Sequence, residues 1–97
     1  MAVVITGGTG AIGSAMAREF AKTNDVAIIY KNSDEKAIQL EKQTGCKAYK
    51  ADVSSVSEIS AAVRQIISDF GKINVLINNA GISQIICIFF IHEMYPR

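Results

Sequence analysis

The chain has 97 residues, with 10 Lys and Arg against 9 Asp and Glu, which is enough for one small domain of marginal stability. The basic residues form no run, so the sequence predicts neither a nucleic-acid partner nor a polybasic membrane-binding surface. Cys46 and Cys87 fit no metal-binding or Cys-x-x-Cys spacing, and nothing at the N-terminus resembles a secretory signal, so we expect free thiols and a cytoplasmic protein.

An apolar run followed by glycines opens the chain. Val3–Thr6 predicts a strand and Ala11–Lys22 a helix, and residues 8–13 between them satisfy G-x-G-x-x-G. In that pattern the glycines serve the tight turn, the approach of a pyrophosphate and helix packing, while the helix N-terminus offers N–H groups and a positive dipole end. The segment therefore predicts a dinucleotide site. The apolar face of the helix is predicted to comprise Ile12, Ala15, Met16 and Phe20.

Two other interpretations of the glycines were weighed. The motif alone does not exclude a glycine loop that serves only to turn the chain. A phosphate loop of the G-x-x-x-x-G-K-[ST] type has the same glycine spacing, with Ser14 after Gly13, but the lysine is missing. Hydrolysis of a nucleoside triphosphate is therefore disfavoured.

Strands and helices alternate through the middle of the chain. Val26–Tyr30 is a continuous apolar run, typical of a strand buried on both faces of a parallel sheet. Ser33 is expected to cap the next helix, which has Asp34 and Glu35 in its first turn and ends at Gly45. A third strand is predicted over Lys47–Ala51.

The last predicted helix begins with a capping box of Ser55 and Glu58 and ends at Gly71, before a fourth strand over Ile73–Ile77. Alternating strands and helices predict an α/β fold, a partial Rossmann-like doubly wound parallel sheet with strand order 3-2-1-4 between two helix layers. The apolar stripe of this helix is predicted to comprise Val56, Ile59, Val63, Ile66, Ile67 and Phe70.

An uncharged stretch from Ile73 to Ile91 raises the question of a membrane span. Asparagine, serine and glutamine interrupt it, and its continuous apolar part, Ile85–Ile91, is far shorter than the roughly 20 residues that a spanning helix needs. We therefore expect no transmembrane segment. The apolar part has instead the composition of an aggregation-prone strand.

Three motifs together resemble the short-chain dehydrogenase/reductase family. They are the glycine loop, Asp52-Val53 after the third strand, and Asn78-Asn79-Ala80-Gly81 after the fourth. The segment from Asp69 to Ile82 looks particularly like bacterial 3-oxoacyl-[acyl-carrier-protein] reductases. The resemblance covers residues 1–84, expected to be the NAD(P)-binding Rossmann half of such an enzyme, and leaves residues 85–97 as an atypical apolar tail.

By this resemblance, the loop backbone lines the pyrophosphate, Asp52 accepts from the adenine amino group, and the segment from Asn79 borders the adenosine ribose. Asp52 could instead be a plain helix cap, and Asn78 and Asn79 could satisfy backbone groups at a strand end. The cofactor-binding residues that the resemblance implies are Gly7, Gly8, Thr9, Gly10, Ala11, Ile12, Tyr30, Lys31, Asn32, Ser33, Asp52, Val53, Asn79, Ala80 and Gly81, with no metal-binding residue.

The glycine loop departs from the family's usual short form, T-G-x-x-x-G-x-G, in having Ala11 at the second of those glycines. Thr6, Gly7, Gly10 and Gly13 match T-G-x-x-G-x-x-G, the spacing of the extended branch. The motif from Asn78 to Gly81 favours the short form. We give the second motif more weight, because alanine adds only a methyl group.

The end of the second strand predicts the cofactor. An acidic residue there would bind the ribose 2′-hydroxyl and repel a 2′-phosphate, but Tyr30 occupies the position, followed by Lys31, Asn32 and Ser33. One cation and several hydrogen-bond donors favour NADP(H) over NAD(H). The alternative is that Lys31 is an ordinary exposed lysine and Ser33 only a helix cap.

The catalytic Tyr-x-x-x-Lys pair of the family has no counterpart, because no tyrosine is followed by lysine four residues later. The resemblance thus implies a truncated NAD(P)-dependent oxidoreductase, inactive as this chain alone, with no catalytic residue assigned. The tail suggests a stop after a frame change. A non-catalytic dinucleotide-binding module or redox sensor, and a fragment that neither folds nor binds, are the alternatives; substrate and oligomeric state stay open, although an intact member could form a homo-oligomer.

Overall fold

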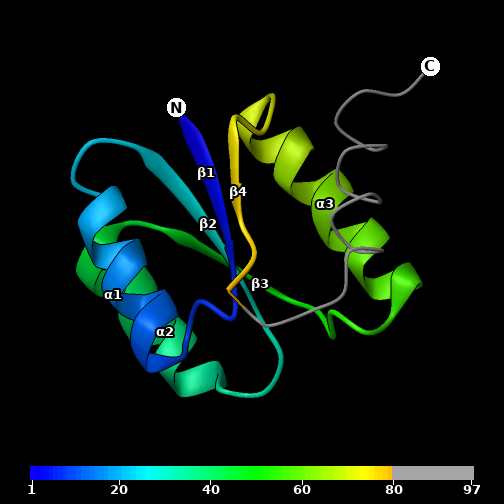
Figure 1. Ribbon diagram of the computed structural model, residues 1–97, viewed down its shortest axis with the longest axis horizontal. Helices are drawn as coiled ribbons and strands as arrows, with labels where there is room; N and C mark the ends of the chain where they lie inside the picture. Colours follow the sequence, from blue (N-terminus) through cyan, green and yellow to red (C-terminus); the bar gives the residue numbers. More distant parts are fainter. Residues whose placement is uncertain (80–97) are drawn as a thin grey trace.

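The computed structural model describes residues 1–79 of the chain. Four strands and three helices alternate within this part (Figure 1). The predictions for Ala80, Gly81, Cys87 and the apolar tail, including the boundary after residue 84, lie outside the described residues. The elements are β1 (Ala2–Thr6), α1 (Ala11–Phe20), β2 (Asp25–Tyr30), α2 (Asp34–Thr44), β3 (Lys47–Lys50), α3 (Val56–Phe70) and β4 (Val75–Ile77).

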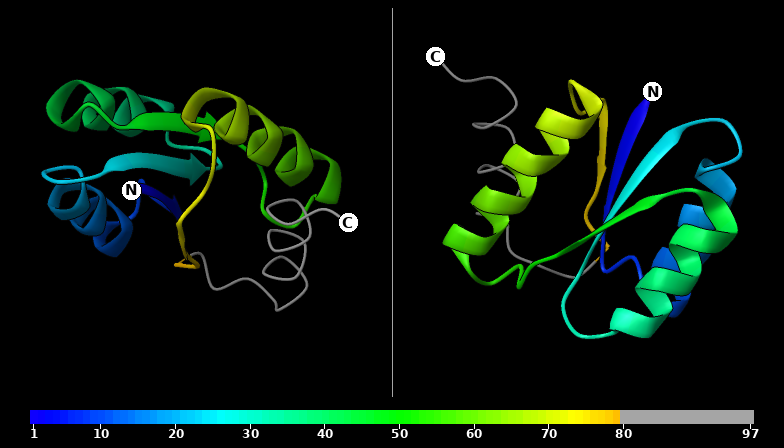
Figure 2. Two further views of the ribbon diagram at one scale, coloured as in Figure 1. Left: turned by 90° about the horizontal axis from the view of Figure 1, so that it is seen from above. Right: turned by 180° about the vertical axis from the view of Figure 1, so that it is seen from behind.

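The strands form one parallel sheet in the order β3-β2-β1-β4, which confirms the predicted fold and strand order. Val3 of β1 lies opposite Val26 of β2 on one side and Val75 of β4 on the other. Helices α1 and α2 cover one face of the sheet and α3 covers the other (Figures 1 and 2). The result is the expected three-layer arrangement.

The core lies on both sides of the two central strands. Alternate residues of β1 point to opposite faces, so Val4 packs in the cluster under α3, while Val3 and Ile5 pack under α1 and α2. Val26 to Ile29 of β2 are likewise buried on both faces. This double burial explains why both strands are continuous apolar runs rather than alternating ones.

Helix α1 differs from its prediction in length and in part of its buried face, although Met16 and Phe20 pack against the core as predicted. It ends at Phe20, two residues before Lys22, and Ile12, with 69% of its surface exposed, and Ala15 lie outside the core. Gly13 and Ala17 are the buried residues of the helix. Ala17 packs in the same core cluster as Met16 and Phe20, and the small size of Gly13 and Ala17 lets the helix axis approach the sheet closely.

The other boundaries shift by a few residues. β3 ends at Lys50 rather than Ala51, although the Ala51 amide still donates to Tyr30 O at 2.8 Å. β4 begins at Val75 rather than Ile73. Asn74, just before it, still pairs with Ala2: its amide donates to Ala2 O at 2.9 Å, and its side-chain Oδ1 accepts from the amide of Ala2 at 2.8 Å.

The predicted helix ends are only partly right. Ser33 occupies the N-cap position of α2 but makes no capping hydrogen bond, whereas Gly45 ends the helix at a φ of 79°, as predicted. Ser55 Oγ accepts from the Glu58 amide at 3.4 Å, but the Glu58 carboxylate reaches the amide of Asp52 rather than that of Ser55. The predicted apolar stripe of α3 begins only at Ile59, because Val56 is 55% exposed.

Candidate functional site at the carboxyl edge of the sheet

The predicted site segments all follow the carboxyl ends of the strands. The glycine loop follows β1, Lys31–Ser33 follows β2, Asp52 follows β3 and Asn79 follows β4. From β1 the chain crosses to β2 on one side, and from β3 it returns to β4 on the other side of β1. Open α/β sheets bind ligands at such a reversal, outside the carboxyl ends of the strands.

The glycine loop is pinned at its start by backbone hydrogen bonds. The amides of Gly7 and Gly8 both donate to Ile29 O, at 2.9 and 3.3 Å. Gly7 has a φ of 67°, in the left-handed region that glycine adopts readily. The amide of Gly10 then donates back to Gly7 O at 3.2 Å, which closes the turn before α1.

Two further glycines are required by close packing. A Cβ atom on Gly8 would lie 2.3 Å from Cβ of the buried Ile28, and one on Gly13 would lie 2.2 Å from Gly7 O. At Gly10 the nearest atom would be 3.5 Å away, an ordinary contact. Ala11 is exposed in the first turn of α1, so the methyl group that departs from the family's short form meets no crowding.

The N-terminus of α1 differs from those of the other two helices. Gly10, at its N-cap, has no side chain to cap the helix, and the first turn carries no acidic residue. By contrast, α2 has Asp34 and Glu35 in its first turn and α3 has Glu58. The first N–H groups of α1 and the positive end of its dipole are therefore exposed without a neutralising carboxylate, an arrangement that suits a bound anion.

The segment after β4 braces this loop. Asn79 Nδ2 donates to Gly7 O at 3.3 Å, and a Cβ on Gly13 would lie 2.9 Å from the same nitrogen. Beneath it, Thr6 is fully buried and its Oγ1 donates to Asn78 Oδ1 at 3.3 Å. Gly13 and Asn78, which were not among the predicted site residues, thus support the loop; their place in the two motifs was the available signal.

The end of β2 carries the residues predicted to choose the cofactor. Tyr30 is half-buried, and burial, followed by the neighbouring Asp34 carboxylate, raises the pKa of its hydroxyl. Asp34 itself pairs with Lys50 of β3 at 3.2 Å, and the hydrogen bonds from Lys50 and Tyr30 lower its pKa. Lys31, Asn32 and Ser33 lie beyond the strand, and the first two are exposed.

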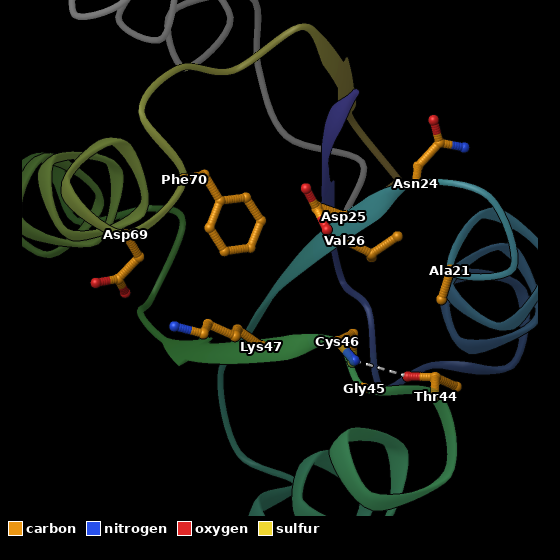
Figure 3. A pocket seen from close by; sticks show the side chains of 10 residues that line it. All are labelled: Ala21, Asn24, Asp25, Val26, Thr44, Gly45, Cys46, Lys47, Asp69 and Phe70. Atoms are coloured by element: carbon orange, nitrogen blue, oxygen red, sulfur yellow. Dashed lines mark hydrogen bonds between the residues drawn. The ribbon is translucent and has the colours of Figure 1, made fainter.

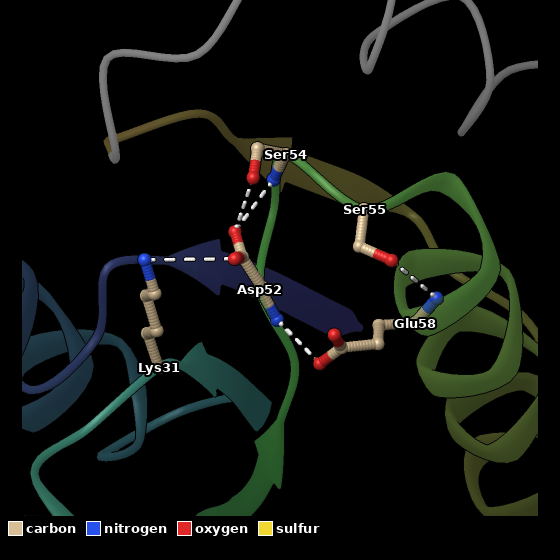
Figure 4. A network of polar contacts seen from close by, with 5 residues as sticks. All are labelled: Lys31, Asp52, Ser54, Ser55 and Glu58. Carbon is tan, nitrogen blue, oxygen red and sulfur yellow. Dashed lines mark hydrogen bonds and ion pairs between the residues drawn. The ribbon is translucent and has the colours of Figure 1, made fainter.

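Asp52 is not the N-cap of α3, which is Ser55, but forms a turn just before it. Its Oδ1 accepts from the amide of Ser54 at 2.9 Å and from Ser54 Oγ at 2.6 Å, which is a local turn ahead of α3 (Figure 4). Its Oδ2 lies 3.5 Å from Lys31 Nζ at the same edge of the sheet. The Ser54 hydrogen bonds first, and then Lys31, lower the pKa of this carboxyl, so Asp52 is ionised at neutral pH.

A cavity of about 390 Å³ lies at the opposite, amino edge of the sheet. Asp25, Lys47, Phe70 and the buried Cys46 are among the residues that line it (Figure 3). Burial raises the pKa of the Cys46 thiol, which is free, as predicted, and protonated at neutral pH. None of the predicted site residues lines this cavity.

Residues 1–79 hold neither a candidate metal site nor a candidate membrane span. No cluster of histidine, cysteine, aspartate or glutamate in that range could hold a metal ion. No helix among the described elements has the length and apolar character needed to cross a bilayer.

Comparison with known proteins matches most of the chain to one family. The family model of the short chain dehydrogenases covers residues 1–94. A probable NADP-dependent mannitol dehydrogenase of Yarrowia lipolytica is 47% identical over 83 residues, which are 80% of this chain and 30% of that protein. A 3-oxoacyl-[acyl-carrier-protein] reductase of Staphylococcus aureus is 33% identical over 87 residues, which are 84% of this chain and 35% of that protein.

A solved structure agrees with these matches. The 3-ketoacyl-(acyl-carrier-protein) reductase of Brucella melitensis, in complex with NADH, superimposes with a TM-score of 0.73 at 31% identity. The match covers 77% of this chain and 32% of that one. The chain thus spans about a third of the length of the relatives that it matches.

Proposed function

Because the chain belongs to the short chain dehydrogenase family, we propose that it is the dinucleotide-binding portion of an NAD(P)-dependent oxidoreductase. The observation that carries the proposal is the N-terminus of α1, which has neither a side-chain cap nor a first-turn carboxylate and follows a close-packed glycine loop. A pyrophosphate would supply the negative charge that the other two helices obtain from their own side chains.

The chain's residues would share the binding of the cofactor. The backbone of Gly7 to Ile12 would hold the pyrophosphate, and Gly8 and Gly13, by having no side chain, let that loop pack closely against Ile28 and α1. Asp52 and Val53 would border the adenine, and Asn79 to Gly81 the adenosine ribose. The bound dinucleotide supplies a hydride acceptor or donor; the residues of this chain position it.

We further propose NADP(H) as the preferred cofactor. Tyr30 stands where an acidic residue would bind the ribose 2′-hydroxyl, and Lys31 follows it as an exposed cation, with Asn32 and Ser33 as hydrogen-bond donors. The names of the relatives support both cofactors, since one is called NADP-dependent and another is in complex with NADH. The preference therefore rests on the residues of the site.

The reaction that we propose for the enzyme containing this portion is reduction of a 3-oxoacyl thioester, on the likeness to reductases of that class. Within residues 1–79 we assign no proton donor. Burial and then a neighbouring carboxylate raise the pKa of both Tyr30 and Tyr49, whereas a tyrosine that delivers a proton near neutral pH needs a lowered pKa. The role that we propose for the described part is to bind the cofactor.

Thermal unfolding of the 97-residue chain with and without NADPH tests the binding. The informative variant is Ala11→Glu, which adds a carboxylate in the first turn of α1 and so stabilises the helix by about 0.3–1 kcal/mol while repelling a phosphate. Ala15→Glu adds the same charge one turn later, at another exposed position.

We expect NADPH to raise the unfolding midpoint of the wild type and of Ala15→Glu, but much less that of Ala11→Glu. Equal shifts in all three proteins would show that the cofactor does not use this helix. No shift in any of them would contradict the proposed function.

A further inference from the structure

The exposed cation of the candidate site is already paired. Lys31 Nζ lies 3.5 Å from Asp52 Oδ2, so the ion pair joins the chain just beyond β2 to the chain just beyond β3 (Figure 4). The Lys31 side chain is 62% exposed and that of Asp52 only 29%. The two charges lie just beyond the carboxyl ends of two adjacent strands, at the edge where a dinucleotide would place its adenosine end.

Asp52 is the fixed member of this pair. Its other oxygen, Oδ1, is held by the amide and the hydroxyl of Ser54, and its amide donates to Glu58 Oε1 at 3.0 Å. Its carbonyl accepts from the amide of Ser55 at 2.9 Å. Lys31, in contrast, has a long flexible side chain whose one ion pair within residues 1–79 is this one, so it can leave Asp52 for another anion without disturbing the backbone.

A 2′-phosphate and Asp52 would compete for the same ammonium group. The phosphate carries a charge of about −1.5 to −2 at neutral pH, and its approach to Lys31 would have to displace the carboxylate or lie beside it. The next cation along the edge, Lys50, is held in the same way by Asp34 at 3.2 Å. Each of these lysines is therefore partly neutralised before any ligand binds.

Given the proposed cofactor site, on which this inference rests, we propose that Asp52 weakens the preference for NADP(H) by holding Lys31 in an ion pair. Asp52 thus acts as a specificity-determining residue through Lys31, in addition to any contact with the adenine. An exposed pair of this kind contributes little in water, so the effect is a modest change in selectivity and not a switch.

The test measures the affinities of the full 97-residue chain for NADPH and NADH by fluorescence titration at low ionic strength. Their ratio isolates the 2′-phosphate, because the adenine and the pyrophosphate are common to both ligands. We expect Asp52→Asn, which keeps the oxygen that Ser54 contacts, to raise the preference for NADPH about 2- to 5-fold. Lys31→Met should lower it.

The Lys31→Met/Asp52→Asn double variant tests the route of the effect. If Asp52 acts through Lys31, removing its charge changes the ratio much less when Lys31 is already gone. A control for net charge is Glu19→Gln, which frees Lys22 from a 3.0 Å ion pair in the last turn of α1, at the far edge of the sheet. It should leave the ratio unchanged.

The outcomes separate the inference from the proposed function. A wild type that binds neither ligand overturns both. If the wild type binds but Asp52→Asn leaves the preference for NADPH over NADH unchanged or lowers it, the inference alone is overturned. The inference is also overturned if Asp52→Asn raises the preference for NADPH equally in the wild-type and the Lys31→Met backgrounds, because Asp52 would then act on the phosphate directly.

Discussion

Asn79 and Gly7 are 72 residues apart in the chain, and Asn79 Nδ2 donates to Gly7 O at 3.3 Å. The contact ties the end of β4 to the glycine loop after β1, across the point where the strand order reverses. The same carbonyl oxygen accepts from the amide of Gly10 and blocks any side chain on Gly13. The position of the loop thus depends on the Asn-Asn motif of a distant strand.

Removing this brace should destabilise the protein modestly. We expect Asn79→Ala to lower the free energy of unfolding by about 0.5–1.5 kcal/mol, the usual contribution of a hydrogen bond. Asn32→Ala removes the same amide group at an exposed position beyond β2 and should change it by less than about 0.5 kcal/mol. Urea unfolding of both variants makes the comparison, and equal losses would show that the Asn79 contact contributes nothing special.

Gly13 offers a test in which two physical effects have opposite signs. Helix propensity alone predicts that Gly13→Ala in α1 stabilises the protein by roughly 1 kcal/mol. Packing predicts a loss of about 1–3 kcal/mol, because the new methyl group would lie 2.2 Å from Gly7 O. We expect packing to prevail in urea unfolding, with a clearly smaller loss for Gly10→Ala, where the nearest atom is 3.5 Å away. A stabilised Gly13→Ala protein would refute the loop geometry.

The two serines at the N-caps of α2 and α3 should differ in their contribution to stability. Ser55 Oγ accepts from the Glu58 amide, whereas Ser33 makes no capping hydrogen bond. Ser55→Ala should therefore cost about 1 kcal/mol of unfolding free energy, and Ser33→Ala less than half of that. Chemical denaturation with a common fitted slope decides the order, and a larger loss at Ser33 would be incompatible with the observed caps.

Tyr49 should contribute to the loss of stability in alkali. Its hydroxyl donates to Asp69 Oδ2 at 2.7 Å, and burial, followed by that carboxylate, raises its pKa above the ordinary value of 10.0. Above pH 10 the unfolded chain loses this proton while the folded protein keeps it, so the free energy of unfolding falls as the pH rises. Tyr49→Phe should make this decline less steep.

The control is to compare Tyr49→Phe with the wild type between pH 6 and 8. In this range Tyr49 ionises neither in the folded nor in the unfolded protein, so any difference in the free energy of unfolding is independent of pH. Tyr30 and Cys46, whose pKa values are also raised, remain in the variant, so part of the decline should persist. Parallel curves for variant and wild type above pH 10 would mean that Tyr49 ionises alike in both states.

The sequence was sufficient for the sheet and for the loop because these depend on local patterns. Apolar runs gave the strands of the core, Gly45 gave the end of α2, and alternation gave the strand order. The sequence did not predict contacts between residues far apart in the chain, or the burial of small residues in a helix. Nothing in the spacing of Lys31 and Asp52 predicts their ion pair, and the predicted face of α1 was right for Met16 and Phe20 but wrong for the exposed Ile12 and Ala15, where Gly13 and Ala17 are buried instead.

The most direct test of the account is a two-dimensional amide NMR titration of the 97-residue chain with NADP⁺. The account predicts that the largest shifts lie at the carboxyl edge of the sheet, in Gly7 to Gly13, in Lys31 to Ser33 and at Asp52. The amides of Cys46 and Lys47, beside the cavity at the opposite edge, should stay in place. Shifts concentrated at that cavity, or none at saturating ligand, would contradict the assignment of a dinucleotide site to the glycine loop.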